Sequence, residues 1–224
     1  MSSAEMAKYI DHTNLKPDAT TADIHKLCEE AAHYGFASVC INPVFVGTAV
    51  KLLTGTGVKV CTVAGFPLGA CTIGIKAREA AAAAEEGAME IDMVIAVGML
   101  KERLYEAVAR DICEVVGAVR RANSQGIVKV IIETCLLQNN EKITACRIAE
   151  AEGANFVKTS TGFSSGGALP EDVALMRNSV SPLVGVKAAG GIRSAAQAIE
   201  MIKAGAARLG TSSGVLIMNE IEYQ

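Results

Sequence analysis

Residues 151–158 read AEGANFVK, and this short stretch contains the pattern that decides the fold. A helical run rich in Ala and Glu ends at Gly153, and a strand-length apolar run then ends at Lys158. Glycine just past a helix adopts the left-handed backbone conformation at little cost. The same transition recurs along the chain, at Gly35, Gly87 and Gly205. Helices therefore alternate with short strands.

Weaker versions of this transition close further helices, at Gly55 and Gly57, Gly126 and Pro182. A first strand at Lys8–Asp11 and a last helix after Ser213 complete eight strand–helix units. Residues 128–132 and 183–186 are nearly continuous apolar runs, as parallel strands covered on both faces require. The sequence therefore predicts an α/β fold, a single-domain (β/α)8 TIM barrel over residues 1–224.

An open, doubly wound sheet is the alternative architecture. It would place a Gly-rich phosphate loop after the first strand, whereas here residues 11–15 read DHTNL and the Gly-rich turns come late. Two helix starts have capping-box spacing, Thr20 with Asp23 and Ser194 with Gln197. The order of the turns favours the barrel.

Composition excludes several classes of protein. Lys and Arg number 21 against 24 Asp and Glu, a net charge of -3, which is too little positive charge to bind nucleic acid or an acidic membrane without specificity. Half of the residues are hydrophobic and the mean hydropathy is +0.32, which excludes a disordered chain. The sequence has no recognisable secretory signal and no apolar stretch of about 18 residues, so we expect a cytoplasmic protein without a membrane span.

The cysteine and histidine patterns favour neither disulfides nor metal. Seven Cys form an odd set without a CxxC pair, so reduced thiols are expected. The three His stand at positions 12, 25 and 33 without the spacing of metal ligands. We therefore predict no metal site.

Polar residues near the ends of the predicted strands are candidates for the site, because barrel enzymes act at the carboxyl ends of their strands. They are Asp11, Cys40, Asn42, Thr62, Glu90, Asp92, Glu133, Lys158, Lys187 and Gly210. An unpaired buried ammonium is costly. In the catalytic interpretation, one of the two lysines is a neutral amine that attacks a carbonyl while the other supplies nearby positive charge. In the alternative, both only pair with carboxylates.

Carboxylates in the run MEIDMVI at residues 89–95 complete this arrangement. Alternation with period two puts Glu90, Asp92 and Val94 on one face of the strand. If that face is the barrel interior, the carboxylates meet the lysines and either can transfer protons. For Glu90 and Glu133 we favour the structural alternative, in which they anchor a Lys or Arg.

Gly-rich segments follow the seventh and eighth predicted strands, at residues 189–193 and 210–214, and a third follows Lys158 at residues 159–162. TIM barrels bind phosphate after strands seven and eight, where backbone N–H groups and helix N-termini face the anion. A lysine that attacks carbonyls beside a phosphate site indicates a Schiff-base aldolase or a related lyase acting on a sugar phosphate.

The chain resembles the deoxyribose-phosphate aldolase family, in its shorter bacterial and archaeal form, from end to end. The matching motifs are DHT at 11–13 with LKP at 15–17, VCINP at 39–43, GFPLG at 65–69, EIDMV at 90–94, FVKTSTGF at 156–163, VKAAGGIR at 186–193 and GTSSG at 210–214. The resemblance implies reversible cleavage of 2-deoxy-D-ribose 5-phosphate to D-glyceraldehyde 3-phosphate and acetaldehyde, with no metal or organic cofactor.

The resemblance also implies roles for individual residues. Lys158 matches the Schiff-base lysine, Lys187 the lysine that lowers its pKa and relays protons, and Asp92 the carboxylate that activates the proton-transfer water. Phosphate binding falls to Gly162, Gly190, Gly191, Arg193, Gly210, Ser212 and Ser213. Further pocket candidates are Asp11, Cys40 and Thr161.

Two positions qualify the resemblance. Ala96 stands where the family usually has Asn, which removes a side-chain hydrogen bond there. Tyr223 matches, by position only, a C-terminal tyrosine that some members use in proton transfer. A homodimer is expected from the family. Two other functions stay open at this point, a metal-free sugar-phosphate isomerase with a carboxylate base and a noncatalytic phosphate-binding protein.

Overall fold

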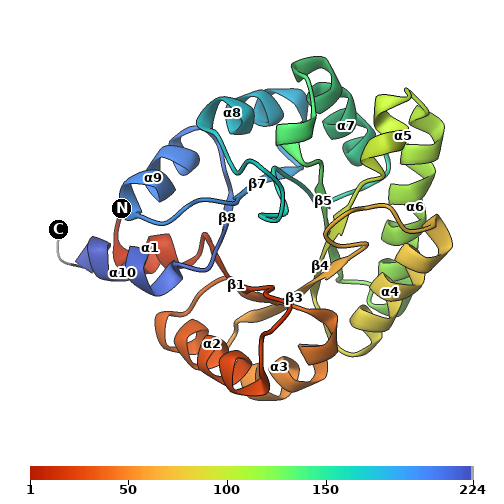
Figure 1. Cartoon of the computed structure of the whole chain (residues 1–224). Coiled ribbons are helices and arrows are strands. Elements are labelled where there is room, and N and C mark those ends of the chain that lie inside the picture. The colour runs from red at the N-terminus through yellow and green to blue at the C-terminus, as the bar shows by residue number, and fades with distance from the viewer. Residues whose placement is uncertain (223–224) are drawn as a thin grey trace.

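Eight parallel strands form a closed barrel in the computed structural model, which describes residues 1–222 (Figure 1). Each strand pairs with the next along the chain, and β8 closes the ring on β1. The strands are β1 (Ile10–Asn14), β2 (Ser38–Ile41), β3 (Lys59–Ala64), β4 (Glu90–Val94), β5 (Ile127–Ile131), β6 (Phe156–Lys158), β7 (Gly185–Ala189) and β8 (Arg208–Thr211). The predicted TIM barrel is confirmed.

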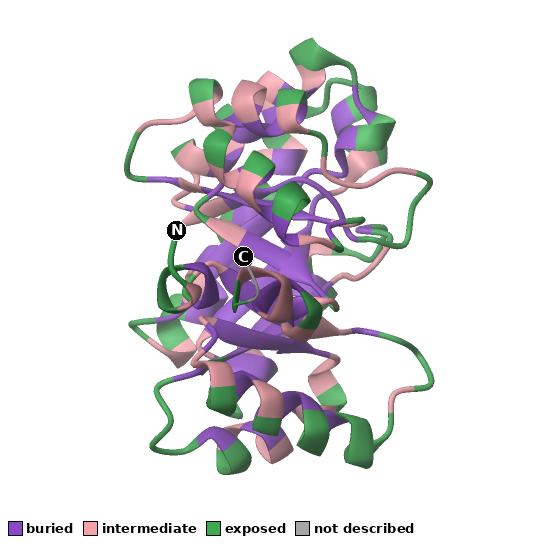
Figure 2. Ribbon diagram, turned by 90° about the vertical axis from the view of Figure 1, so that its left-hand side faces the viewer, coloured by how far each residue is buried: buried purple, intermediate pink, exposed green. Residues whose placement is uncertain are grey.

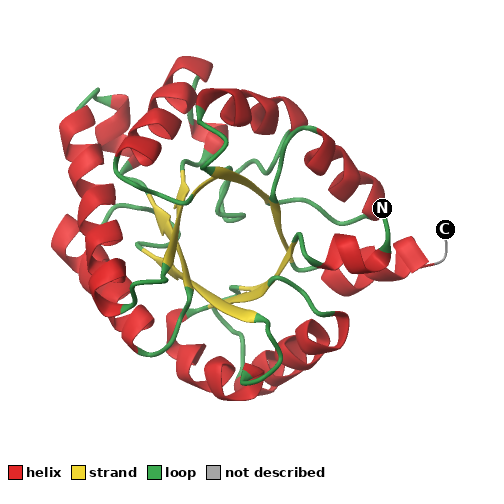
Figure 3. Cartoon of the chain, turned by 180° about the vertical axis from the view of Figure 1, so that it is seen from behind, coloured by secondary structure: helices red, strands yellow, loops and turns green. Residues whose placement is uncertain are grey.

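Helices surround the barrel on all sides (Figure 3). They are α1 (Ser3–Ala7), α2 (Thr21–Tyr34), α3 (Val46–Leu53), α4 (Ile73–Glu85), α5 (Val97–Lys101), α6 (Tyr105–Ala122), α7 (Asn139–Ala151), α8 (Pro170–Ser179), α9 (Ala195–Lys203) and α10 (Gly214–Glu222), with 3-10 turns η1 (Pro43–Phe45) and η2 (Thr134–Leu136). Within residues 1–222, each helix is too short or too polar to cross a lipid bilayer.

The predicted helix boundaries depend on glycine and on capping side chains. Gly35 has φ +66° and its N–H donates to the carbonyl of Ala31, which ends α2. At the other end of α2, Thr20 and Asp23 cap each other reciprocally. Ser194 accepts a hydrogen bond from the N–H of Gln197, as predicted, although the Gln197 side chain turns back to the N–H of Arg193 instead of to Ser194.

The structure differs from the sequence prediction in the first strand. The predicted strand at Lys8–Asp11 is displaced, because a capping box between Ser2 and Glu5 starts the short helix α1, for which Lys8 is the C-cap. The strand β1 then continues to Asn14, which pairs in register with Ile41 of β2. The expectation that Glu90 closes a strand is also wrong, since Glu90 is the first residue of β4.

Hydrophobic burial is concentrated between the barrel and its helices (Figure 2). The inner faces of α2 and α6 contribute Ile24, Leu27, Val108 and Ile112 to this layer. The barrel interior differs from the usual filling of branched apolar side chains, because it contains several fully buried charged residues. These charged residues form the candidate active site.

Candidate active site

Asp92, in the middle of β4, receives hydrogen bonds from three lysines inside the barrel. Its Oδ2 accepts from Lys158 Nζ at 2.8 Å and from Lys187 Nζ at 2.7 Å, and its Oδ1 accepts from Lys129 Nζ at 2.8 Å. The carboxylate is fully buried. The structure thus brings together Asp92, Lys158 and Lys187, as the sequence predicted, and adds Lys129.

Strand register explains this convergence. Lys158 of β6 is the partner of Lys187 in β7, and Asp92 of β4 is the partner of Lys129 in β5. Paired residues on neighbouring strands project from the same face of the sheet. The two side chains of each pair therefore lie next to each other in the barrel interior.

A second group of charges lies against the first. Lys187 Nζ lies 2.6 Å from Asp11 Oδ2, and Lys129 Nζ lies 2.6 Å from Glu90 Oε2. Arg208 of β8 binds Asp11 and donates to both carboxylate oxygens of Glu90, at 2.9 and 3.1 Å. We call these seven residues the barrel charge network: Asp11, Glu90, Asp92, Lys129, Lys158, Lys187 and Arg208.

The network sets the protonation of several members. Burial opposes ionisation of Asp92, but Lys129, Lys158 and Lys187 outweigh it and hold its pKa well below the ordinary value. Burial likewise opposes the charge of Lys187, yet Asp11 and Asp92 raise its pKa above the ordinary value. Asp92 is therefore a carboxylate and Lys187 an ammonium at neutral pH.

Lys158 is the member of the network that lines a cavity. The cavity has a volume of about 820 Å³ and opens at the carboxyl ends of the strands. It is bordered by predicted phosphate-site residues, namely Gly162, Gly190, Gly191, Arg193, Gly210, Ser212 and Ser213, and by Thr161. A ligand in this cavity reaches the Lys158 amine first, while Asp92 and Lys187 lie behind that amine.

Two of the Gly-rich turns border the cavity where helices begin. Gly190 and Gly191 have φ +93° and +81°, a region that side chains disfavour, and they precede α9. The turn after β8 precedes α10, and Thr211 Oγ1 accepts a hydrogen bond from the N–H of Ser213. Helix N-termini at such turns favour bound anions.

The loop after β6 is held by Glu133. This residue itself has φ +57°, and its carboxylate accepts hydrogen bonds from the N–H and, at 2.5 Å, the Oγ1 of Thr161. The expected anchoring of a Lys or Arg by Glu133 is therefore wrong, because no Lys or Arg in residues 1–222 forms an ion pair with it. Glu90, by contrast, does anchor Lys129 and Arg208.

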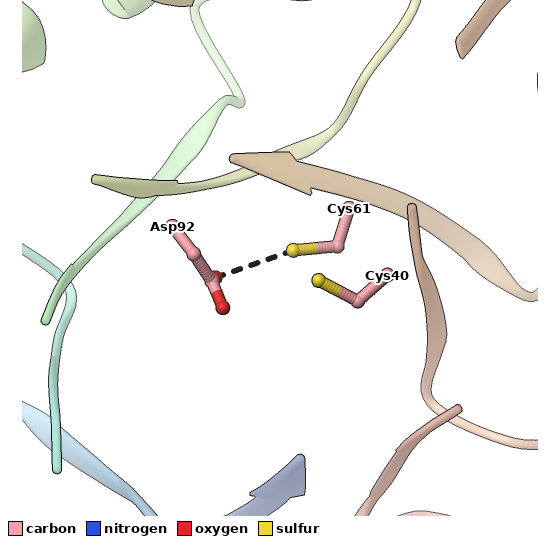
Figure 4. Close-up of side chains that lie close together, drawn as sticks. All are labelled: Cys40, Cys61 and Asp92. Carbon is pink, nitrogen blue, oxygen red and sulfur yellow. Dashed lines mark hydrogen bonds between the residues drawn. The ribbon is translucent and has the colours of Figure 1, made fainter. Parts of the chain in front are cut away.

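Cys40 and Cys61 are register partners on β2 and β3, and both thiols point toward Asp92 (Figure 4). Cys61 Sγ donates to Asp92 Oδ1 at 3.2 Å. The two sulfur atoms and a carboxylate oxygen of Asp92 lie within 4.8 Å of one another, close enough to bind a metal ion together. Lys129 Nζ already contacts two of them, Asp92 Oδ1 at 2.8 Å and Cys61 Sγ at 3.2 Å. Two of these three atoms thus accept hydrogen bonds from the Lys129 ammonium. The predicted lack of a metal site stays a prediction.

The remaining predicted residues lie deeper or outside the described chain. Asp11 and Cys40 are fully buried and do not line the cavity. Tyr223 lies outside the described residues. The sequence prediction did not include Lys129. The signal was present, because Lys129 is a single charged residue within the apolar run at residues 128–132, just as Lys158 and Lys187 are single charged residues at the ends of apolar runs.

Comparison with known proteins identifies the family. A model of the DeoC/LacD family aldolases matches residues 5–220. The chain belongs to this aldolase family. This aldolase is 61% identical over 213 residues to a deoxyribose-phosphate aldolase of Geobacillus sp. (strain WCH70), covering 95% of this chain and 94% of the relative. It is 58% identical over 218 residues to a deoxyribose-phosphate aldolase of Carboxydothermus hydrogenoformans, covering 97% and 96%.

A solved structure agrees with this assignment. The aldolase superposes on deoxyribose phosphate aldolase from Aeropyrum pernix with a TM-score of 0.92 at 36% identity, covering 99% of this chain and 92% of that one. That protein is described as having a unique tetrameric structure. The charge network thus lies in the barrel of an aldolase, a lyase that breaks carbon–carbon bonds.

Proposed function

We propose that this aldolase reversibly cleaves 2-deoxy-D-ribose 5-phosphate to D-glyceraldehyde 3-phosphate and acetaldehyde through a Schiff base on Lys158. One observation carries the proposal. Lys158 is the single member of the charge network that lines the cavity, and its amine lies 2.8 Å from a buried carboxylate. The names of the relatives supply the substrate.

The proposed reaction starts with attack of the neutral Lys158 amine on the C1 aldehyde. Loss of water gives an iminium ion, which withdraws electrons from the C2–C3 bond. That bond breaks as the proton of the C3 hydroxyl passes to Asp92, directly or through water. D-glyceraldehyde 3-phosphate leaves, and an enamine of acetaldehyde stays on Lys158.

The second half of the proposed reaction returns the enzyme to its starting state. The enamine carbon that was C2 takes up one proton, relayed from Asp92 or from the Lys187 ammonium, and becomes an iminium again. Water then hydrolyses it, which releases acetaldehyde and the free amine. Lys187 is suited to the relay because its Nζ lies 2.7 Å from the same carboxylate oxygen that Lys158 contacts.

For the phosphate, we propose the turns at Gly190–Gly191 and Gly210–Ser213, with Gly162 and Arg193 at the border of the same cavity. These turns precede α9 and α10, and Gly-rich turns before helix N-termini favour a bound anion. Binding at this nonreacting end would align C1 with Lys158. Thr161 supports the adjoining loop through Glu133.

The proposal extends to compartment and assembly. The seven cysteines are free thiols, which suits a reducing cytoplasm. We also propose a homodimer, on the ground of the family resemblance, and sedimentation velocity measures it directly.

Reductive trapping tests the reaction. Incubation with acetaldehyde followed by borohydride should add one ethyl group, about 28 Da, to Lys158, because only an imine is reduced to a stable secondary amine. Lys158→Met should lose the adduct, and Lys142→Met, which removes a lysine between α7 and α8, should keep it. An isomerase or a noncatalytic binding protein would leave Lys158 underivatised, and an adduct chiefly on Lys187 would reverse the two roles.

A further inference from the structure

The barrel charge network contains one more basic group than acidic groups. Its three carboxylates belong to Asp11, Glu90 and Asp92, and its four bases belong to Lys129, Lys158, Lys187 and Arg208. Apart from Arg208, at 12%, every one of these side chains is at most 3% exposed. With all four bases protonated, the network would have an uncompensated positive charge in a water-poor interior, which is costly.

Three further polar side chains face the network. Ser38 is uncharged and accepts a hydrogen bond from Arg208. Cys61 donates to Asp92, and burial raises the pKa of its thiol. The hydrogen bond with Cys61 lowers the pKa of Cys40, so ionisation of this thiol would offset part of the excess positive charge. The carboxylate of Glu133 is directed to Thr161. His12, the neighbour of Asp11 in β1, has its ring against Glu30 of α2 at 2.7 Å.

The contacts show which base most readily gives up its proton. An arginine does not deprotonate in proteins. Lys129 lies within 4 Å of all three carboxylates, at 2.6, 2.8 and 3.9 Å, and Lys187 within 4 Å of two, at 2.6 and 2.7 Å. Of the same three carboxylates, Lys158 lies within 4 Å of Asp92 only. The least compensated ammonium is thus the one beside the cavity.

We propose that Lys129 is a positioning residue, whose buried charge makes Lys158 the base without a proton. This inference rests on the proposed Schiff-base function. Lys129 has no access to the cavity and acts through Asp92, since it occupies Oδ1 and leaves Oδ2 to Lys158 and Lys187. Without the Lys129 charge, the three remaining bases would balance the three carboxylates, and Lys158 would keep its proton.

The test measures the pH dependence of trapping by acetaldehyde and borohydride, in the full-length protein. Lys129→Met should move the profile toward alkaline pH by about 1 to 2 pH units, which is the effect of one charge a few ångströms away at an intermediate dielectric. At pH values on the rising part of the profile, trapping should then be about 10- to 100-fold slower. Trapping should recover in alkali.

Glu90→Gln provides the opposite change, because it removes one carboxylate from the same network. Its profile should move toward acid pH, and the double variant Lys129→Met, Glu90→Gln should return close to the wild-type position. If Lys129 mattered only for packing, removing the Glu90 charge as well would not restore the profile. Glu90→Gln alone keeps the proposal testable if Lys129→Met does not fold.

Lys142→Met is the matched control, because it removes a lysine from a close ion pair with Asp172, outside the barrel, and should leave the profile in place. If wild-type Lys158 is not labelled at any pH, the proposed function fails. If the wild type is labelled but the profile of Lys129→Met stays in place, or that of the double variant moves further than that of Lys129→Met, the role of Lys129 is refuted while the function stands.

Discussion

Lys158 and Lys187 are register partners on adjacent strands, and both donate to the same oxygen of Asp92. What distinguishes them is the second partner. Lys187 also contacts Asp11 at 2.6 Å, whereas Lys158 faces the cavity on its other side. Two identical side chains at equivalent positions therefore have different surroundings, and the proposed mechanism gives them different roles.

Lys187→Leu should leave the barrel folded but displace the pH–rate profile toward alkali. The substitution removes a cation from beside Lys158, so the fraction of neutral amine at pH 7 falls. We expect kcat/KM for the phosphorylated sugar to fall by about 100-fold or more near neutrality, with partial recovery at high pH. A profile that keeps its position while the rate drops would make Lys187 only a proton relay or a binding group.

Ser212→Glu should separate phosphate binding from chemistry. Ser212 lies in the turn between β8 and α10 at the cavity wall, where a carboxylate would repel the substrate phosphate. The ratio of kcat/KM between deoxyribose 5-phosphate and deoxyribose should narrow by about 10-fold or more, the effect of adding one unfavourable charge interaction with the phosphate. Labelling of Lys158 by acetaldehyde, which has no phosphate, should continue. An unchanged ratio would place the phosphate elsewhere.

A second buried ion pair lies at the carboxyl end of β4. Lys76 of α4 lies 2.5 Å from Asp111 of α6 and also donates to the carbonyls of Val94 and Gly69, at 2.7 and 3.3 Å. Both side chains are at most 1% exposed. Burial raises the pKa of Asp111, an effect that Lys76 opposes.

The two partners of this pair should differ in what their removal costs. Asp111→Asn leaves a buried ammonium without its counter-ion and should lower the free energy of unfolding by about 3 to 5 kcal/mol. Lys76→Met should cost less at pH 5, because Asp111 can then take up a proton and become neutral. Urea denaturation of both variants measures the difference, and equal losses at pH 5 would contradict this account.

Acid should unfold the protein only well below pH 4. Burial opposes the ionisation of Asp11, yet Lys187 and Arg208 lower its pKa, and the pKa of Asp92 is also lowered. A lowered pKa stabilises the fold fully above the ordinary value of about 3.9, and this stabilisation is lost as pH falls toward the folded-state value.

The corresponding measurement is the free energy of unfolding between pH 5 and pH 2. Asp11→Asn should flatten its decline, because one of the two fully buried carboxylates with lowered pKa is gone. Asp18→Asn, in the loop between β1 and α2, removes an exposed carboxylate outside the network and should keep the wild-type slope. If Asp11→Asn keeps that slope as well, Asp11 does not contribute in this way.

Local signals in the sequence were sufficient for the architecture. Gly35 and Gly153 end helices as predicted, with φ +66° and +82°, and the lysines that end apolar runs meet Asp92. Alternation along a strand shows which side chains face inward. It does not show their depth along the barrel axis, since depth depends on the register by which the ring closes.

The sequence did not show how far along the barrel axis Glu90 and Lys129 lie. Glu90 and Asp92 alternate correctly onto one face, yet Glu90 begins its strand and binds Arg208, which is 118 residues further along the chain. Lys129 has apolar neighbours on both sides in the sequence, and its carboxylate partners come from β1 and β4. The interrupted apolar run marks Lys129 as unusual, but the neighbouring sequence does not show which distant carboxylates it pairs with.

The position of Arg208 in the last strand has a consequence for how the molecule comes together. During synthesis Asp11 emerges first, Glu90 follows, and the guanidinium that joins them arrives only with β8, the eighth strand of the barrel. A half-made barrel therefore has acidic groups at its centre without their arginine, and closing the sheet there is disfavoured. Closure of the barrel is thus coupled to the arrival of β8, which supplies both the pairing partner of β1 and the guanidinium that binds Asp11 and Glu90.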